Sequence, residues 1–253
     1  MHINFSDAVP DMYLPIEEIC DRGFAVLSFW HEDVSCDEDM QKPQGLYDVM
    51  YKGIEKNEYH CGKIGMWSWA ASRVMDYAQT ITKLDKTRAT VVGHSRLGKT
   101  ALLTGALDTR FSCVISNNSG CGGAAVCRGN TGEQIKDITK NFGYWFCNRY
   151  RKYIDNTEEL PFDQHYLIAA IAPRKVYVSS AADDFWADPV SEYLSCFAAS
   201  EVYEKLGIRG ADFPDRLPEV GDVYHGGNIA YHMRAGKHYL SREDWLHFMD
   251  YLI

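Results

Sequence analysis

The stretch ATVVGHSRLGKTALLTGALD, residues 89–108, decides the fold. Its first part, 89–95, has the pattern of a buried strand that ends at Ser95, and the following residues have the apolar spacing of a helix. A serine at a sharp strand-to-helix turn is typical of a nucleophile elbow, which lifts the hydroxyl clear of the sheet. Leu97 stands where the second glycine of G-x-S-x-G belongs, and Gly98 comes one place late. The alternative interpretation of Ser95 is an ordinary helix cap.

Strand and helix patterns alternate along the rest of the chain. Apolar runs predict strands at 23–30, 113–116, 173–180 and around 229–233, and helical spacing predicts helices at 63–82, 97–108, 190–205 and 241–252. We interpret 23–30 as a strand covered on both faces. This order predicts an α/β fold with a mostly parallel sheet and helices on both faces, and the elbow makes it an α/β-hydrolase fold.

Residues 1–253 are expected to form a single domain, because no linker or internal repeat interrupts them. The region at about 117–162 breaks the alternation, and we interpret it as an insertion over the sheet. Before the strand at 23–30 only INF (3–5) is available, so the sheet is expected to lack its first strands. A missing N-terminal segment or a second copy of the chain, as a homo-oligomer, is expected to cover the open edge.

Composition excludes several classes of protein. The formal net charge is −9 and the 26 Lys and Arg residues form no run, so a nucleic-acid partner is not expected. No apolar stretch is long enough for a membrane span, and the N-terminus lacks the pattern of a signal peptide. The eight cysteines include no CxxC pair. We therefore expect a cytoplasmic protein without metal or cofactor, although a signal peptide lost with a missing N-terminus is the alternative.

A serine nucleophile needs a histidine base, which follows the acid in this fold. His238 lies in RAGKHYLS, between the last predicted strand and the final helix, where the base of an α/β hydrolase belongs. His232 falls inside that strand and His247 inside the helix, so both are interpreted as structural. His225, in YHGG, is the alternative base.

Two adjacent carboxylates are candidates for the acid. Asp183 and Asp184 follow the strand VYVSSAA at its carboxyl end, the edge of the sheet where ligands bind in open α/β folds. A carboxylate there can orient a histidine and stabilise its imidazolium form. The alternative is that both aspartates cap the next turn, as Asp188 before Pro189 is expected to do.

Four motifs in order carry a family resemblance over about residues 10–250. They are GHSRLGKTAL, SGCGG, LPFDQHYLIAAIAPRKVYV and SAADDFWADP. Together they resemble the glucuronoyl esterase family, family fifteen of the carbohydrate esterases, some of whose relatives are labelled acetylxylan esterases. Four ordered motifs are much more specific than a lone elbow.

The resemblance implies roles for individual residues. Arg96, after the serine, would help to stabilise the oxyanion, Lys99 would hold sugar hydroxyls, and Trp186 would contact the sugar. Many members carry the acid as a glutamate twenty-three residues after the serine, where this chain has Asn118. Because an amide carries no charge to stabilise imidazolium, the resemblance favours Asp184 as the acid.

The second oxyanion donor is expected from the loop after an earlier strand, and Asn4-Phe5-Ser6 follows the fragmentary strand INF. His60 and Cys61 adjoin each other, but two ligands in one loop do not predict a metal site.

The sequence therefore predicts a carboxylic-ester hydrolase that acts on carbohydrate esters through an acyl-enzyme. Ser95 is the expected nucleophile, His238 the base and Asp184 the acid. Glucuronoyl esters are the expected substrates, as small molecules or on oligosaccharides. The alternatives are an acetyl (xylan) esterase and a hydrolase-like scaffold that binds without catalysis.

Overall fold

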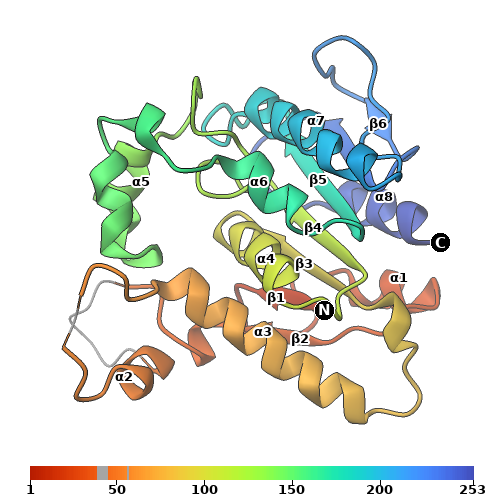
Figure 1. The fold of residues 1–253 in the computed structure, drawn as a ribbon. Helices are drawn as coiled ribbons and strands as arrows, with labels where there is room; N and C mark the ends of the chain where they lie inside the picture. Colours follow the sequence, from red (N-terminus) through yellow and green to blue (C-terminus); the bar gives the residue numbers. More distant parts are fainter. Residues whose placement is uncertain (39–44, 56) are drawn as a thin grey trace.

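The computed structural model of the chain describes residues 1–38, 45–55 and 57–253. Within these residues one seven-stranded sheet has the order β2-β1-β3-β4-β5-β7-β6. Every strand pair is parallel except β6 with β7, at one edge. The predicted α/β fold with a mostly parallel sheet is therefore confirmed (Figure 1).

The strands are β1 (His2–Asn4), β2 (Ser28–Trp30), β3 (Thr90–His94), β4 (Cys113–Asn117), β5 (Lys175–Ala181), β6 (Val223–Tyr224) and β7 (Ile229–Arg234). The α-helices are α1 (Ile16–Asp21), α2 (Leu46–Met50), α3 (Lys63–Thr80), α4 (Arg96–Leu107), α5 (Ile135–Phe142), α6 (Gln164–Ala169), α7 (Pro189–Lys205) and α8 (Arg242–Leu252). Short 3₁₀ helices span His31–Asp33, Lys86–Arg88, Gly143–Trp145, Asn148–Tyr153 and Thr157–Glu159.

Two apolar cores lie on opposite faces of the sheet because strand side chains alternate. In β5, Val176 and Val178 belong to the core that α3, α4, α6 and α7 cover, whereas Tyr177 belongs to the core that α1 and α8 cover. Figure 1 shows these helices arranged about the central strands. Both faces of β4 and β5 are thereby buried, which explains the apolar runs at 113–115 in β4 and 176–178 in β5.

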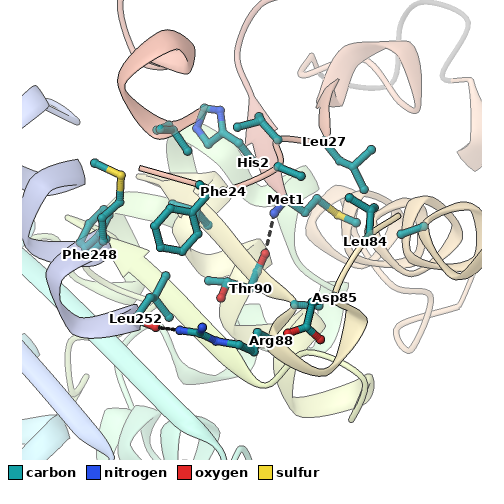
Figure 2. A pocket seen from close by; sticks show the side chains of 18 of the residues that line it. Met1, His2, Phe24, Leu27, Leu84, Asp85, Arg88, Thr90, Phe248 and Leu252 are labelled. Atoms are coloured by element: carbon teal, nitrogen blue, oxygen red, sulfur yellow. Dashed lines mark hydrogen bonds between the residues drawn. The ribbon is translucent and has the colours of Figure 1, made fainter. Parts of the chain in front are cut away.

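The expectation of a covered strand over 23–30 is wrong in both extent and burial. Only Ser28–Trp30 form a strand, and β2 lies at the edge of the sheet with all three residues partly exposed. Gly23 has a positive φ of 85°, so the backbone turns where the apolar run begins. The apolar residues at 24–27 instead line a cavity (Figure 2).

That cavity, of about 610 Å³, lies at the amino ends of β1 and β3. Its wall includes Phe24, Leu27 and Phe248, and the Met1 amino group donates a hydrogen bond of 2.6 Å to the carbonyl of Thr90 beside it (Figure 2). Ser95 follows the carboxyl end of β3, so this cavity and the elbow lie at opposite ends of the strands.

Between β4 and β5 the chain runs through α5, three 3₁₀ helices and α6. All eight cysteines are free thiols. Across the described residues, no helix combines the length and apolar character that crossing a membrane would require.

Candidate active site

Ser95 occupies a strained turn between β3 and α4. Its φ and ψ are 56° and −127°, and its backbone N–H donates a 2.9 Å hydrogen bond to the carbonyl of Asn117 in β4. A Cβ on Gly93 would come within 2.0 Å of the Leu97 carbonyl oxygen, so the first turn of α4 folds back onto this glycine. The close approach explains why glycine is required at 93.

Gly98 has a separate reason to lack a side chain. A Cβ there would lie 3.0 Å from both Ser116 Oγ and Ser119 Cβ, so α4 packs very closely against the end of β4. The displaced second glycine therefore serves helix–strand packing.

The structure brings His238 and Asp184 together. His238 Nδ1 lies 2.6 Å from Asp184 Oδ2, and the Asp184 side chain is only 4% exposed, against 43% for His238. The neighbouring Asp183 is exposed and uses its backbone N–H to bond the carbonyl of Gly236. Asp188 caps α7, as its turn interpretation expected. The geometry thus favours Asp184 over Asp183 as the partner of the histidine.

His94, the residue before the serine, packs against the proposed base. Its ring centroid lies 4.5 Å from that of His238, and its Nδ1 lies 2.6 Å from Asn117 Oδ1. Burial and the proximity of His238 lower the pKa of His94 to about 3, so His94 stays neutral at working pH. Among the described residues the Ser95 hydroxyl makes no hydrogen bond, and such contacts are often long in unliganded enzymes.

The other candidate histidines form a separate cluster. His225 Nε2 and His232 Nδ1 lie 2.7 and 2.9 Å from the Tyr177 hydroxyl. The ring of His247 lies 4.7 Å from that of His232. His225 is thus engaged with Tyr177, whereas His238 is the histidine paired with Asp184.

Arg96 is held beside the elbow by charge and by two aromatic rings. Its guanidinium forms an ion pair with Asp37 and lies 4.7 Å from the ring centre of Phe5 and 5.6 Å from that of Trp145. Trp145 Nε1 donates a 2.6 Å hydrogen bond to Asp37 as well. Burial opposes ionisation of Asp37, but hydrogen bonding with His31 and the charge of Arg96 outweigh it and lower the pKa. Sequence reasoning missed Asp37, because nothing in its local sequence distinguishes it.

The loop after β1 does lie beside the elbow. The Phe5 ring is 5.9 Å from that of His94. The Phe5 N–H donates a 2.8 Å hydrogen bond to the side chain of Asn4, so in this structure it is not free to act as the second oxyanion donor. As the first residue of α4, Arg96 presents a backbone N–H that no helical carbonyl can accept. The oxyanion donor predicted from the elbow is thus placed next to Ser95.

Lys99 is buried, not exposed on its helix. Its Nζ donates hydrogen bonds of 2.5 and 2.6 Å to the carbonyls of Ser119 and Cys121, in the SGCGG loop. It also lies 3.9 Å from Glu133 Oε2. Lys99 therefore ties the loop after β4 to the first turn of α4.

Glu133 is a further candidate substrate-binding residue that sequence reasoning missed. It is 6% exposed, and its N–H donates a 2.8 Å hydrogen bond to the carbonyl of Trp186. Burial raises the pKa of Glu133, and the charge of Lys99 offsets this only in part. The Trp186 side chain is 55% exposed. A lone glutamate in an irregular segment offers no sequence signal, and only the fold brings it beside Lys99 and Trp186.

Asn118 lies where the resemblance placed an alternative acid. Its Nδ2 donates a 3.1 Å hydrogen bond to the carbonyl of Tyr239, the residue after His238, and its Oδ1 accepts a 2.7 Å bond from the N–H of Ala181. The position thus adjoins the loops that carry both proposed partners of Ser95.

No group of three or more His, Cys, Asp or Glu residues that could hold a metal ion occurs in the described part of the chain. Cys61 Sγ lies 3.1 Å from the Tyr51 hydroxyl.

Comparisons with known proteins identify the family. The sequence model of the family "Glucuronyl esterase, fungi" matches residues 9–207. A carbohydrate esterase from an unknown prokaryotic organism is 41% identical over 241 residues, 93% of this chain and 54% of that protein. A 4-O-methyl-glucuronoyl methylesterase of Podospora anserina is 31% identical over 81% of this chain and 43% of its own length.

A solved structure agrees in fold. The glucuronoyl esterase from Solibacter usitatus superposes with a TM-score of 0.89 and 36% identity, over 95% of this chain and 62% of that one. The chain spans about half the length of the two curated relatives described. The match over residues 9–207, together with this fold, shows that the chain belongs to the glucuronyl esterase family.

Proposed function

We propose that this chain is a serine carboxylic-ester hydrolase that cleaves glucuronoyl esters through an acyl-enzyme. The observation that carries the proposal is the 2.6 Å contact between His238 and Asp184, together with the strained Ser95 at the carboxyl end of β3. Relatives named glucuronoyl methylesterases support the choice of ester.

In the first half of the reaction, Ser95 Oγ attacks the ester carbonyl carbon and His238 takes the hydroxyl proton. Asp184, buried and bonded to Nδ1, leaves Nε2 as the nitrogen that takes this proton and stabilises the imidazolium. The backbone N–H and guanidinium of Arg96 stabilise the negative oxygen of the tetrahedral intermediate. His238 then returns the proton to the departing alkoxide, which leaves as the alcohol.

In the second half of the reaction, His238 removes a proton from a water molecule while the water oxygen attacks the acyl carbon. The bond to Ser95 Oγ breaks, the serine regains its proton, and the free acid is released. The neutral state of His94 is important here, because a second positive charge would oppose formation of the His238 imidazolium.

Three side chains support recognition of a uronic acid. Lys99 and Glu133 bring charged hydrogen-bonding groups to one place, and Trp186 adds an exposed ring on which a sugar can stack. A site with buried polar groups rejects a substrate that leaves them unpaired, so an acetyl ester is expected to be the poorer substrate.

The experiment compares Ser95→Ala, His238→Ala and His225→Ala with the wild type on benzyl glucuronate and an aryl acetate. The first two variants are expected to lose on the order of 10⁴–10⁶ in turnover, because nucleophile and base act as a unit. His225→Ala is expected to stay near normal. Labelling of wild-type Ser95 by a fluorophosphonate would count against a binding scaffold, and preference for the aryl acetate would indicate an acetyl esterase. Normal turnover by His238→Ala would refute the assignment of the base.

A further inference from the structure

His238 lies in the loop of residues 235–241 between β7 and α8. Its side chain is 43% exposed, so the ring contact with His94 leaves much of the imidazole uncovered. The loop is instead wrapped around the guanidinium of Arg234, the last residue of β7. Nη1 donates a 2.8 Å hydrogen bond to the Ala235 carbonyl, and Nη2 donates to the carbonyls of Lys237, at 3.2 Å, and Tyr239. The carbonyls of the two residues that flank His238 thus accept hydrogen bonds from one nitrogen atom.

Arg234 is itself fixed by a buried carboxylate. Its Nε donates a 2.8 Å hydrogen bond to Asp244 Oδ2, and the two side chains are 6% and 0% exposed. Asp244 also lies 2.8 Å from His232 Nε2 and accepts a 2.6 Å bond from the N–H of Ser241. Burial opposes ionisation of Asp244, but His232 and Arg234 outweigh it and hold the pKa below its usual value. A buried charge pair with all these hydrogen bonds is geometrically rigid.

The same residue joins the loop of the base to the loop of the acid. The Arg234 carbonyl accepts a 2.9 Å hydrogen bond from the N–H of Ala182, and the Gly236 carbonyl accepts another of 2.9 Å from the N–H of Asp183. Asp184 follows directly. Main-chain bonds therefore set the acid loop against the segment that the guanidinium shapes.

We propose that Arg234, fixed by Asp244, is a positioning residue that holds His238 in register with Asp184 and Ser95. The inference rests on the proposed function, because it assigns a role through the proposed base. Catalytic geometry tolerates little error, and a displacement of about 1 Å can cost on the order of 100-fold in rate. The guanidinium touches no reacting atom and acts only through the loop.

Arginine is required for a physical reason. Three nitrogens in a rigid plane serve one carboxylate and three carbonyls that lie in different directions, which the single ammonium nitrogen of lysine cannot do. Arg234→Lys therefore keeps the charge opposite Asp244 and removes most bonds to the loop.

The test measures kcat, KM and thermal midpoint for Arg234→Lys on benzyl glucuronate. We expect kcat to fall by about 10- to 100-fold with KM within about twofold, since the loss lies in the transition state. The matched control is Arg242→Lys, whose guanidinium pairs with Glu18 at the surface and is 67% exposed. That variant is expected to keep both constants. Asp244→Asn is the second variant, and an intermediate loss of kcat is expected because the anchor loses its charge.

A spectroscopic readout separates positioning from general stability. The Nδ1 proton between His238 and Asp184 is expected to give a downfield proton resonance in the wild type and in Arg242→Lys. In folded Arg234→Lys, or in Asp244→Asn if the lysine variant does not fold, this resonance is expected to broaden by exchange with water.

Two results would overturn the inference: a folded Arg234→Lys variant with unchanged kcat, or one in which kcat and the thermal midpoint fall while the resonance stays intact. If Arg234→Lys does not fold, unchanged kcat in Asp244→Asn would also overturn the inference. An active Ser95→Ala variant would instead refute the proposed function, and the resonance would still decide whether Arg234 holds His238.

Discussion

Glu192, in α7, is a fully buried carboxylate whose ionisation should make stability depend on pH. Its Oε1 accepts hydrogen bonds of 2.7 and 2.9 Å from the N–H groups of Ser119 and Gly120, and its Oε2 accepts one of 2.6 Å from Ser180 Oγ. Burial raises the pKa of Glu192 from 4.5 to about 7, although these hydrogen bonds and others oppose the rise. The folded protein therefore binds this proton more tightly than the unfolded chain does.

The sign and size of this pH dependence follow from the linkage between proton binding and folding. Between pH 4.5 and about 7 the folded state binds more protons, so the contribution of Glu192 to stability falls as the pH rises through this range. With 1.36 kcal/mol for each pKa unit, ionisation costs the folded state about 3 kcal/mol above pH 7. Glu192→Gln keeps an acceptor for the two N–H groups and can donate to Ser180, as the protonated acid does, but it cannot ionise.

Urea and thermal unfolding of the wild type and Glu192→Gln at pH 5 and pH 8 measure the effect. The stability of the variant relative to the wild type is expected to rise by about 2 to 3 kcal/mol between these pH values, or roughly 5–10 °C in thermal midpoint. Glu201→Gln, on the same helix but with a surface carboxylate paired with Lys205, is the control and is expected to follow the wild type. A difference between Glu192→Gln and wild type that does not change with pH would refute the reasoning.

Two further substitutions test the site. Lys99→Ala is expected to lower turnover of a glucuronate ester roughly tenfold or more and to leave a small aryl acetate nearly unaffected. Equal losses on both esters would mean that Lys99 supports the elbow through the carbonyls of Ser119 and Cys121. Asp37→Asn removes the charge opposite Arg96 and is expected to reduce kcat by about tenfold on both esters, because the oxyanion forms in each case. Unchanged kcat on both would show that the two aromatic rings suffice to hold Arg96.

The predicted strands after residue 89 agree with the structure to within one or two residues, because each is a local apolar run in a sheet covered on both sides. The run at 23–30 gave the wrong extent and burial. Its strand, β2, pairs only with β1 and lies at the edge of the sheet. The sequence of an apolar segment does not show whether a strand will lie on each side of it.

The sequence by itself determined the elbow and the order of the four longest strands and the four longest helices, because a glycine, a turn and a periodic helix act over a few neighbouring residues. It also supplied the motifs of the family, and the roles assigned to Ser95, His238 and Asp184 stay predictions until the variants are measured. Only the tertiary structure decided which histidine meets Asp184, fifty-four positions away, and that His225 bonds Tyr177 instead.

The tertiary structure alone also revealed the supporting groups. Asp37 reaches Arg96, and Glu133 reaches Lys99, across long stretches of chain. Arg234 and Asp244 look in sequence like a strand end and a helix cap, although they meet in the interior beneath the loop of His238. The local sequence around a charged residue does not show which residue it pairs with. A buried charge must be paired because water is excluded, and only the fold determines which opposite charge is buried beside it.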